Sequence, residues 1–338
     1  MKSKKSSVYI IGTLVLIVIA VALVLLIVNA DKLQQIFFRP GDETGKSASD
    51  SYKELQSVTI GGKKYMQRKE LTNILIIGLD TFGEAVDSDS YNNSQQADFV
   101  TLVSVDRTAK TYTVLHLNRD TMTDINVLDI TGTRRVRTIK AQLALAHTYG
   151  NGLHVSCKNT VDAVSDMLFG LRIDHYISMT MDAVKILTDE LGGVTLTVNQ
   201  DLTSVNPEWA EGKTVTLSGE DALEFVRLRQ SLPDSSNLSR MERQKVFMSA
   251  VIDKLVEAKK THTGNSFFIS LYDSVAEYTV TDASATSFAE IADNIADYTS
   301  GGILSPEGQA ALGTEFMEFY ADEEKLRELA IRLFYKED

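Results

Sequence analysis

The chain has 338 residues and a formal net charge of −12, and its residues are 43% hydrophobic and 24% charged. This composition is typical of a globular protein, and the length allows one large domain or two modest ones. The acidic balance argues against a nucleic-acid binder, which needs clustered lysine and arginine. The single cysteine, Cys157, excludes an internal disulfide and a cysteine-cluster zinc site. No two of the five histidines have the spacing of a metal pair, so a cysteine–histidine metal enzyme is not expected.

Three lysines in the first five residues precede an uncharged apolar run from Val8 to Val28. At about 1.5 Å per residue, such a run forms a helix of about 32 Å, long enough to cross a bilayer. The basic flank predicts that residues 1–7 stay in the cytoplasm, that residues 8–28 anchor the chain, and that the rest lies outside the cell. The alternative is a signal peptide cleaved near Ala30, but the apolar run exceeds the roughly 7–15 residues of a signal core.

Residues 29–70 indicate a polar tether that ends in a small hairpin around Gly61 and Gly62. The continuous apolar run at 73–79 then predicts a strand buried on both faces. Further strands are expected at 98–105, 111–117, 175–179 and 194–198. Helices are expected at 139–149, 157–169 and 182–191, after Ser218, and from Ser239 to about residue 260.

The order of these elements predicts an α/β domain over residues 71–260, with a central, mostly buried sheet and helices on both faces. One transmembrane helix precedes it. The acidic residues 261–338 keep helical periodicity at 288–295 and 326–333. They are therefore expected to form an acidic helical extension packed on the domain.

Polar residues flank three of the predicted strands. Asp80 ends the first strand, Asp98 begins the next, and Arg119 and Asp120 follow the third. If these strands are neighbours, two carboxylates and an arginine meet at one edge of the sheet, which suits a magnesium ion and a phosphate. A turn-capping aspartate and a surface salt bridge would explain the same residues, so the spacing leaves both interpretations open.

A second polar cluster comprises Arg227 and Arg229, followed after a loop by Arg240, Arg243 and Gln244. The last three share one face in the first turns of a predicted helix. Cations are unfavourable at a helix N-terminus unless an anion lies between them, and arginine suits bidentate phosphate contacts. The cluster predicts a phosphorylated ligand, although salt bridges to nearby acidic residues would also explain it.

At these residues the chain resembles the LytR–CpsA–Psr family of Gram-positive cell-envelope phosphotransferases. Seven motifs agree and occur in the family's order. They are NILIIGLD (73–80), ADFVTLVSVD (97–106), LHLNRDT (115–121), ALAHTYGNG (144–152), DHYISMTMDAVKILTDELGGV (174–194), LSGEDALEFVRLR (217–229) and SRMERQKV (239–246).

The resemblance implies an extracellular enzyme that moves a glycopolymer from an undecaprenyl-pyrophosphate carrier to peptidoglycan through a phosphodiester link. A pyrophosphatase side activity is a further implication. The implied partners are the lipid-linked polymer, peptidoglycan and the membrane, with no nucleic acid. The implied alternative is a non-catalytic polyprenyl-pyrophosphate scaffold or an envelope-linked regulator. A transcription regulator is disfavoured, because a cytoplasmic segment of about seven residues cannot hold a DNA-binding domain.

The resemblance also assigns roles residue by residue. It implies Mg²⁺, or alternatively Mn²⁺, on Asp80 and Asp98, and it makes Asp98, Arg119 and Asp120 the catalytic candidates. The implied pyrophosphate-binding residues are Arg119, Arg227, Arg229, Arg240, Arg243 and Gln244. An apolar tunnel for the prenyl tail is implied as well. Its candidate lining residues, which core packing explains equally well, are Leu145, Val164, Leu168, Phe225 and Phe247.

The chain departs from the family's pattern at several places, including the loop around residues 233–237, which lacks the usual glycine-rich stretch. Phe99 replaces a threonine that usually follows the second aspartate, and Asn118 replaces a proline. Gln142 stands where a lysine is common. These changes leave the charged residues intact and bear on the identity of the acceptor and the polymer.

Overall fold

The structure, a computed structural model, describes residues 57–87, 95–129, 131–132, 134–228, 236–261, 266–282 and 298–338. The predicted membrane span at 8–28 and the helical pattern at 288–295 lie outside these residues. Within the described part of the chain, no helix is long and apolar enough to cross a membrane.

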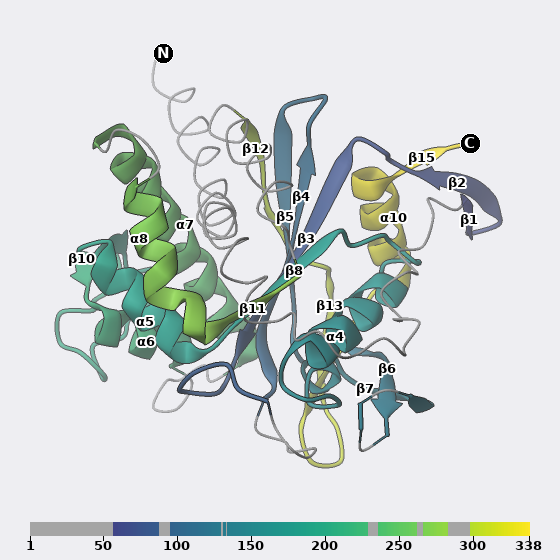
Figure 1. Ribbon diagram of the computed structural model, residues 1–338, viewed down its shortest axis with the longest axis horizontal. Helices are drawn as coiled ribbons and strands as arrows, with labels where there is room; N and C mark the ends of the chain where they lie inside the picture. The colour runs from purple at the N-terminus through teal and green to yellow at the C-terminus, as the bar shows by residue number, and fades with distance from the viewer. Residues whose placement is uncertain are drawn as a thin grey trace, which may run out of the picture.

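A six-stranded sheet forms the centre of the molecule (Figure 1). In spatial order its strands are β11 (Thr279–Thr281), β8 (His175–Met179), β3 (Leu71–Leu79), β4 (Ala97–Asp106), β5 (Thr111–Leu117) and β12 (Thr299–Leu304). β3 runs parallel to β8, and β5 runs parallel to β12. β4 runs antiparallel to both of its neighbours, and β11 runs antiparallel to β8.

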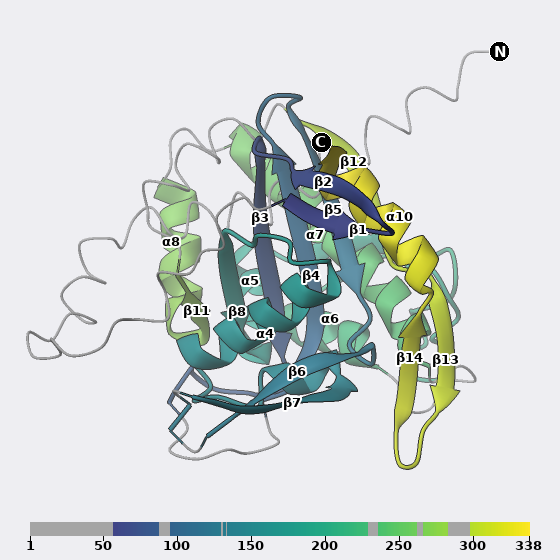
Figure 2. The ribbon, with the colours of Figure 1, turned by 90° about the vertical axis from the view of Figure 1, so that its right-hand side faces the viewer.

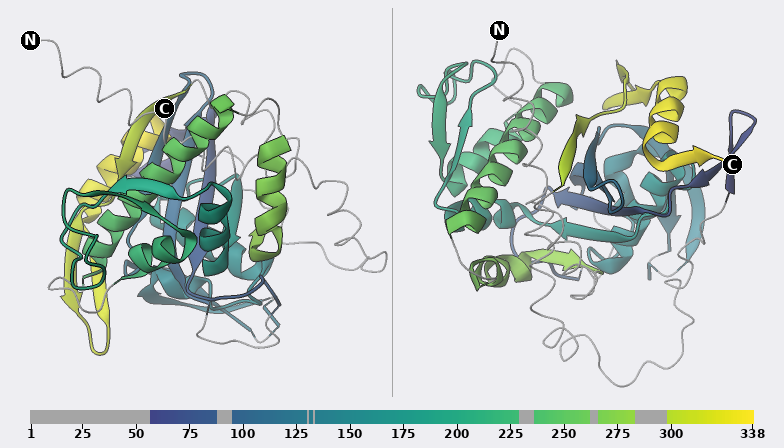
Figure 3. Two further views of the ribbon diagram at one scale, coloured as in Figure 1. Left: turned by 90° about the vertical axis from the view of Figure 1, so that its left-hand side faces the viewer. Right: turned by 90° about the horizontal axis from the view of Figure 1, so that it is seen from above.

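Helices cover both faces of this sheet, as predicted (Figures 2 and 3). On one face lie α5 (Met181–Glu190), α6 (Gly219–Arg227) and α7 (Asn237–Thr261), with α8 (Ser266–Val275) beside α5. On the other face lie α4 (His154–Met167) and α10 (Glu323–Phe334). Because side chains alternate along a strand, β3 supplies Ile74 and Ile76 to one core and Leu75 and Ile77 to the other.

Four smaller sheets complete the described part of the fold. The predicted hairpin around Gly61 and Gly62 is confirmed, and its second strand also pairs with the C-terminal strand. These elements are β1 (Ser57–Ile60), β2 (Lys63–Gln67) and β15 (Tyr335–Glu337). The other pairs are β6 (Met122–Leu128) with β7 (Arg135–Gln142), β9 (Val194–Thr197) with β10 (Thr214–Leu217), and β13 (Gly308–Leu312) with β14 (Met317–Ala321).

The prediction of a helix at 139–149 is wrong. Its first part belongs to β7, which pairs with β6, and a short 3-10 helix, η2 (Leu143–Ala146), follows. The backbone N–H groups of Leu143 and Ala144 bond to the carbonyls of Thr121 and Arg119. These long-range bonds replace the local ones of an α-helix, so the segment follows the loop after β5.

Ser239 is not the N-cap of its helix, because α7 begins two residues earlier. Its hydroxyl donates to Gln200 instead. By contrast, Ser218 does cap α6, in a capping box with Asp221.

The tail beyond residue 260 is only partly helical. The helix predicted from Leu326 onward is confirmed as α10, and α8 lies nearer the start of the tail. A short 3-10 helix, η3 (Ala276–Tyr278), leads into β11. β11 and β12 both come from this tail and form the two edges of the central sheet. The expectation of a purely helical extension is therefore wrong.

Candidate functional site

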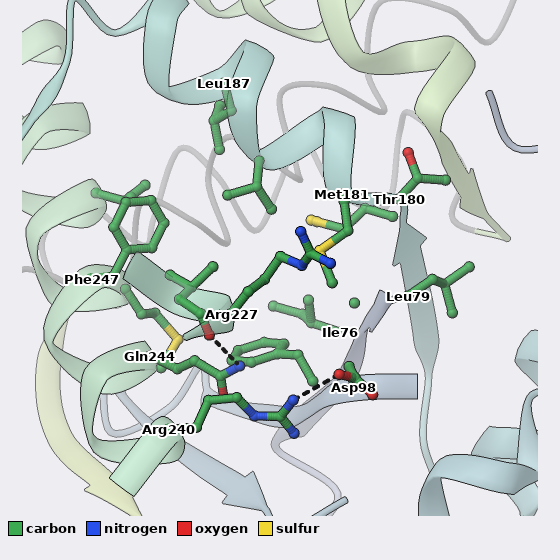
Figure 4. A pocket seen from close by; sticks show the side chains of 17 residues that line it. Ile76, Leu79, Asp98, Thr180, Met181, Leu187, Arg227, Arg240, Gln244 and Phe247 are labelled. Carbon is green, nitrogen blue, oxygen red and sulfur yellow. Dashed lines mark hydrogen bonds and ion pairs between the residues drawn. The ribbon is translucent and has the colours of Figure 1, made fainter. Parts of the chain in front are cut away.

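The polar residues at the ends of β3, β4 and β5 meet at one edge of the sheet, as their spacing predicted. The antiparallel pairing of β4 with both neighbours brings its first residues beside the last residues of β3 and β5. Asp98 lies at the centre and forms ion pairs with Arg119 and with Arg240. The second of these joins Arg240 Nη1 to Asp98 Oδ2 at 2.7 Å and connects the sheet to α7 (Figure 4).

A chain of buried side chains holds Arg240 in place. Its Nη2 donates to Asn237 Oδ1 at 2.6 Å. Asn237 Nδ2 in turn donates to Asn118 Oδ1, also at 2.6 Å, and that oxygen accepts the backbone N–H of Asp120. The start of α7 is thus fixed to the loop after β5. Asn118, which departs from the family's pattern, makes this connection. Its partner Asn237 carries no sequence pattern that predicted a place in the site.

Asp80 lies beside the same cluster. Its Oδ1 accepts the backbone N–H of Gln96 at 2.9 Å, and the Gln96 side chain accepts a hydrogen bond from Arg119. Gln96 therefore links the Asp80 carboxylate to the arginine that pairs with Asp98. Burial raises the pKa of Asp80, against the opposing effects of the Gln96 hydrogen bond and the Arg119 charge.

Asp120 is buried behind Arg119. Arg119 Nε lies 3.5 Å from Asp120 Oδ1, and Gln142 Nε2 donates to the same oxygen at 3.2 Å. Gln142 is the last residue of β7, so this contact joins the β6–β7 hairpin to the cluster. Gln142, which stands where the family usually has a lysine, thus donates a hydrogen bond to Asp120, one of the predicted catalytic carboxylates.

The second predicted cluster divides into two parts. Arg227 and Gln244 line the same cavity as Asp98 and Arg240. The Arg227 guanidinium lies 5.0 Å from the centre of the Phe82 ring, a cation–π contact that leaves its N–H groups available. Gln244 Nε2 is 3.5 Å from the carbonyl of Val226.

Arg243 is completely buried and takes another place. It donates to the carbonyls of Phe225 and Leu228 at the end of α6, and to the hydroxyl of Ser239. The structure therefore sets Arg243 against the C-terminal end of α6, next to Arg227, and not among the residues that line the cavity. Arg229 lies outside the described residues.

An apolar cavity of about 140 Å³ extends from the charged cluster between the sheet and helices α5, α6 and α7. Figure 4 shows Asp98 facing Arg240 at one side of the cavity, while the Arg227 side chain extends between Ile76 and Met181. Its apolar lining consists of Ile76, Leu79, Phe99, Met179, Met181, Val184, Leu187, Val226, Phe247, Met248 and Val251. Of the five predicted tunnel residues, only Phe247 is among the lining residues.

The other four predicted tunnel residues belong to the hydrophobic cores or pack against them. Phe225 is buried behind the cavity lining and packs edge-on against Trp209. Leu145, Val164 and Leu168 belong to the core on the opposite face of the sheet. The three methionines of the lining were missed, because apolar residues on a strand or on a helix face predict a core and a cavity equally well.

The donor atoms at the sheet edge fit a hard cation in type. Asp80 and Asp98 supply carboxylate oxygens, which Mg²⁺ prefers over nitrogen or sulfur ligands. Among the described residues, no group of three or more histidine, cysteine, aspartate or glutamate side chains could hold a metal. A cation here would take its remaining ligands from water or from a bound phosphate.

The fold and the site define an α/β protein in which arginines and a carboxylate gather at one end of an apolar cavity. The chain belongs to the LytR–CpsA–Psr family, whose model matches residues 37–328.

Curated relatives agree with this membership. The chain is 30% identical over 203 residues to polyisoprenyl-teichoic acid–peptidoglycan teichoic acid transferase TagT of Bacillus subtilis, covering 57% of this chain and 55% of that protein. It is 29% identical over 208 residues to biofilm regulatory protein A of Streptococcus mutans, covering 59% and 47%. The chain thus spans about half the length of these relatives.

Solved structures share the fold. The crystal structure of B. subtilis TagT matches with a TM-score of 0.56 at 22% identity, over 78% of this chain and 90% of that one. Protein gbs0355 of Streptococcus agalactiae matches with a TM-score of 0.62 at 20% identity, over 78% and 86%.

Proposed function

We propose that this protein transfers a glycopolymer from an undecaprenyl-pyrophosphate carrier to peptidoglycan and joins them through a phosphodiester link. One observation carries the proposal: Arg227, Arg240 and Asp98 line the same cavity as a continuous set of apolar side chains. A polyprenyl pyrophosphate has an anionic head and an apolar tail, and it matches both parts of this cavity. TagT of Bacillus subtilis and TagU of Enterococcus faecalis, another relative, are both named polyisoprenyl-teichoic acid–peptidoglycan teichoic acid transferases. These names support a polyisoprenyl-linked polymer and peptidoglycan as the substrates.

The pyrophosphate would bind to arginines that now pair with Asp98. Arg119 and Arg240 both contact that carboxylate, and a pyrophosphate offers them more charge and more acceptor oxygens. Among the described residues, the Arg227 guanidinium contacts the Phe82 ring, and we propose that this guanidinium turns to the same anion. Arg229 and Gln244 are proposed to complete this pocket. We assign Arg243 a positioning role, since its donors fix the end of α6 beside Arg227.

In the proposed reaction, the acceptor hydroxyl oxygen attacks the phosphorus that carries the polymer. A new P–O bond to the acceptor forms, and the bridging P–O bond of the pyrophosphate breaks. Undecaprenyl phosphate leaves with that electron pair, and a carboxylate takes the hydroxyl proton. Asp98 is our candidate for this base, because the pyrophosphate would compete with it for the charges of Arg119 and Arg240. Asp120 would keep the Arg119 side chain oriented toward the site. Water in place of the acceptor would give the pyrophosphatase side reaction.

Most of the rate enhancement would come from charge stabilisation and positioning, as in other phosphoryl transfers. We propose that Mg²⁺, or Mn²⁺, binds Asp80 and Asp98 and supplies further positive charge to the phosphate oxygens. Burial raises the pKa of Asp80, so a cation bound nearby would stabilise the ionised form of this carboxylate.

We further propose that residues 8–28 anchor the protein in the cell membrane, with a cytoplasmic N-terminus and the catalytic domain outside. A protease added to intact protoplasts should then digest the chain beyond residue 30. A domain that becomes sensitive only after lysis would contradict this topology.

The direct test of function uses the purified full-length protein, a lipid-linked polymer and peptidoglycan fragments. We expect release of undecaprenyl phosphate and formation of a polymer–peptidoglycan phosphodiester, both detected by mass spectrometry. A non-catalytic scaffold would bind the lipid pyrophosphate without releasing either product.

A further inference from the structure

The loop between β5 and β6, which carries Arg119 and Asp120, is held from two sides. On one side, the backbone N–H of Leu143, the first residue of η2, donates to the carbonyl of Thr121 at 2.8 Å. On the other side, the backbone N–H of Phe319 donates to the carbonyl of Asp120 at 2.9 Å, and Phe319 forms a β-bridge with Thr121. Phe319 belongs to β14, so a strand of the C-terminal tail reaches the candidate site.

Gln142 joins these two supports. Its side-chain amide nitrogen donates to the carbonyl of Met317 at 2.7 Å and to Asp120 Oδ1 at 3.2 Å. An amide nitrogen carries two N–H groups, so one side chain can serve both acceptors at once. Gln142 ends β7 and Met317 begins β14, 175 residues further along the chain. Figure 2 shows β14 and the β6–β7 hairpin at the same end of the central sheet.

The carboxylate that Gln142 contacts lies behind one of the site's arginines. Asp120 Oδ1, which accepts the Gln142 hydrogen bond, is also the oxygen that lies 3.5 Å from Arg119 Nε. The other end of the Arg119 guanidinium pairs with Asp98. A donor on Oδ1 fixes the direction in which this carboxylate faces, and the carboxylate in turn orients the guanidinium. The contacts therefore run from the tail through Gln142 and Asp120 to Arg119.

We propose that Gln142 is a positioning residue of the transfer reaction, which fixes the Asp120 carboxylate behind Arg119 and makes the β13–β14 hairpin a part of the site. The inference rests on the proposed function and adds to it a role for one side chain and for the C-terminal tail. Gln142 is only half-buried and belongs to neither hydrophobic core. Its loss should therefore weaken binding of a pyrophosphate far more than it weakens the fold.

The test measures binding of the full-length protein in detergent to farnesyl pyrophosphate, whose short tail makes the contacts of the pyrophosphate head dominant. Gln142→Met keeps the length of the side chain but removes both donors. We expect its affinity to fall about tenfold, because a hydrogen bond to a charged group is lost. The melting temperature should stay within a few degrees of the parent's.

Two further variants show whether the donors matter. Gln142→Lys restores donor groups at a similar reach and should bind within about threefold of the parent. Gln309→Met is the matched control, since Gln309 is exposed on β13 of the same hairpin, and it should bind like the parent. A loss in Gln142→Lys as large as that in Gln142→Met would overturn the proposal. So would an equal loss in Gln309→Met.

A double-mutant cycle separates positioning from a merely structural role. If Gln142 acts through Arg119, then Gln142→Met should lower the affinity of the Arg119→Ala variant by less than about twofold. A structural role would lower the affinity by the same factor in both backgrounds, which would overturn the proposal.

The same measurements distinguish failure of this inference from failure of the proposed function. A parent protein that binds no prenyl pyrophosphate, or an Arg119→Ala variant that binds it like the parent, would overturn the proposed role of Arg119 and this inference with it. Normal binding by the parent, a clear loss in Arg119→Ala and no loss in Gln142→Met would overturn this inference alone.

Discussion

On one face of the central sheet, α4 and α10 cover a closed apolar core; on the other, α5, α6 and α7 leave a cavity between themselves and β3. The same strands serve both faces, since Leu75 and Ile77 point into the closed core and Ile76 and Gly78 lie along the cavity. The two faces therefore differ in what covers the sheet and not in the sheet itself. The closed face supplies stability, and the open face retains room for a ligand.

Small and flexible side chains keep the second face open. Gly78 lies opposite Phe99 in the sheet, and a Cβ on this glycine would lie only 3.0 Å from the Cβ of Phe99. Met179, Met181 and Met248 also line the cavity. Methionine side chains are unbranched and adapt to irregular shapes, which suits a cavity that receives a flexible tail.

The most direct test of this comparison is one substitution on each face, and the larger of the two effects is expected on the closed face. Leu102→Ala removes a fully buried side chain from the closed core, so it should lower the free energy of unfolding by about 2–5 kcal/mol. Val184→Phe fills the cavity and should instead weaken binding of a long prenyl pyrophosphate about tenfold. Denaturant unfolding and lipid affinity should be measured on both variants.

A short-chain pyrophosphate is the internal control for the cavity variant. Its head binds the arginines while its tail does not reach the filled region, so Val184→Phe should leave its affinity unchanged. A loss of the long-tailed ligand's affinity in Leu102→Ala at a temperature where the variant is folded would mean that the closed face also holds the lipid.

The next effect concerns the charged end of the cavity. Arg240→Ala removes a buried guanidinium whose charge-assisted hydrogen bonds are each worth about 1.5–3 kcal/mol, so affinity for undecaprenyl pyrophosphate should fall up to about 100-fold. Arg240→Lys should not restore it, because an ammonium lacks the planar fork that reaches both Asp98 and Asn237. Arg107→Lys, at an exposed position, is the control. If Arg240→Lys binds like the parent, the cluster acts only as diffuse charge.

A smaller effect is expected at the edge of the cluster. Asp80→Asn keeps the oxygen that accepts the Gln96 N–H but removes the negative charge. We expect the magnesium concentration for half-maximal turnover to rise about tenfold, because one of two anionic ligands is lost. The melting temperature should stay within a few degrees. Unchanged magnesium dependence would contradict the metal assignment, and a large fall in melting temperature would make Asp80 a structural residue.

Strong local patterns made much of the fold and the sheet-edge cluster predictable. The apolar patterns of β3, β4 and β5 depend on few residues each, and the short turn at 107–110 makes β4 and β5 neighbours. Asp80, Asp98 and Arg119 then converge because antiparallel pairing leaves no other arrangement of these ends.

Features that depend on distant contacts were not predictable in the same way. β11 has three residues and β12 contains two consecutive glycines, so neither has a strong strand pattern of its own. They become strands by pairing with β8 and β5. The start of α7 was misplaced for the same reason: Ser239 and Glu242 have the better local capping pattern, but Asn237 is fixed by its bonds to Asn118 and Arg240.

The smallest expected effect concerns His116, a buried residue whose ring contacts Phe99 beside the cavity. Burial, together with the smaller effects of the positive charges of Lys245 and Arg240, lowers the pKa of His116 to about 3. Below the usual pKa of about 6.5, the unfolded chain therefore takes up a proton that the folded protein excludes, and stability falls as the pH falls. At pH 6 this difference amounts to about 1 kcal/mol.

His116→Leu removes that penalty, so between pH 8 and pH 6 the variant should lose about 1 kcal/mol less stability than the parent. Denaturant unfolding at both pH values gives this difference directly. Asp253, whose pKa burial raises to about 6, acts in the opposite direction in both proteins and cancels in the comparison. Equal losses of stability in the parent and the variant would show that His116 takes up a proton in the folded protein as it does in the unfolded chain. The charged end of the cavity would then accommodate protonated His116 as a second positive charge beside Arg240. A site that attracts anions through Arg240 should accommodate such a charge only when an anion is already bound.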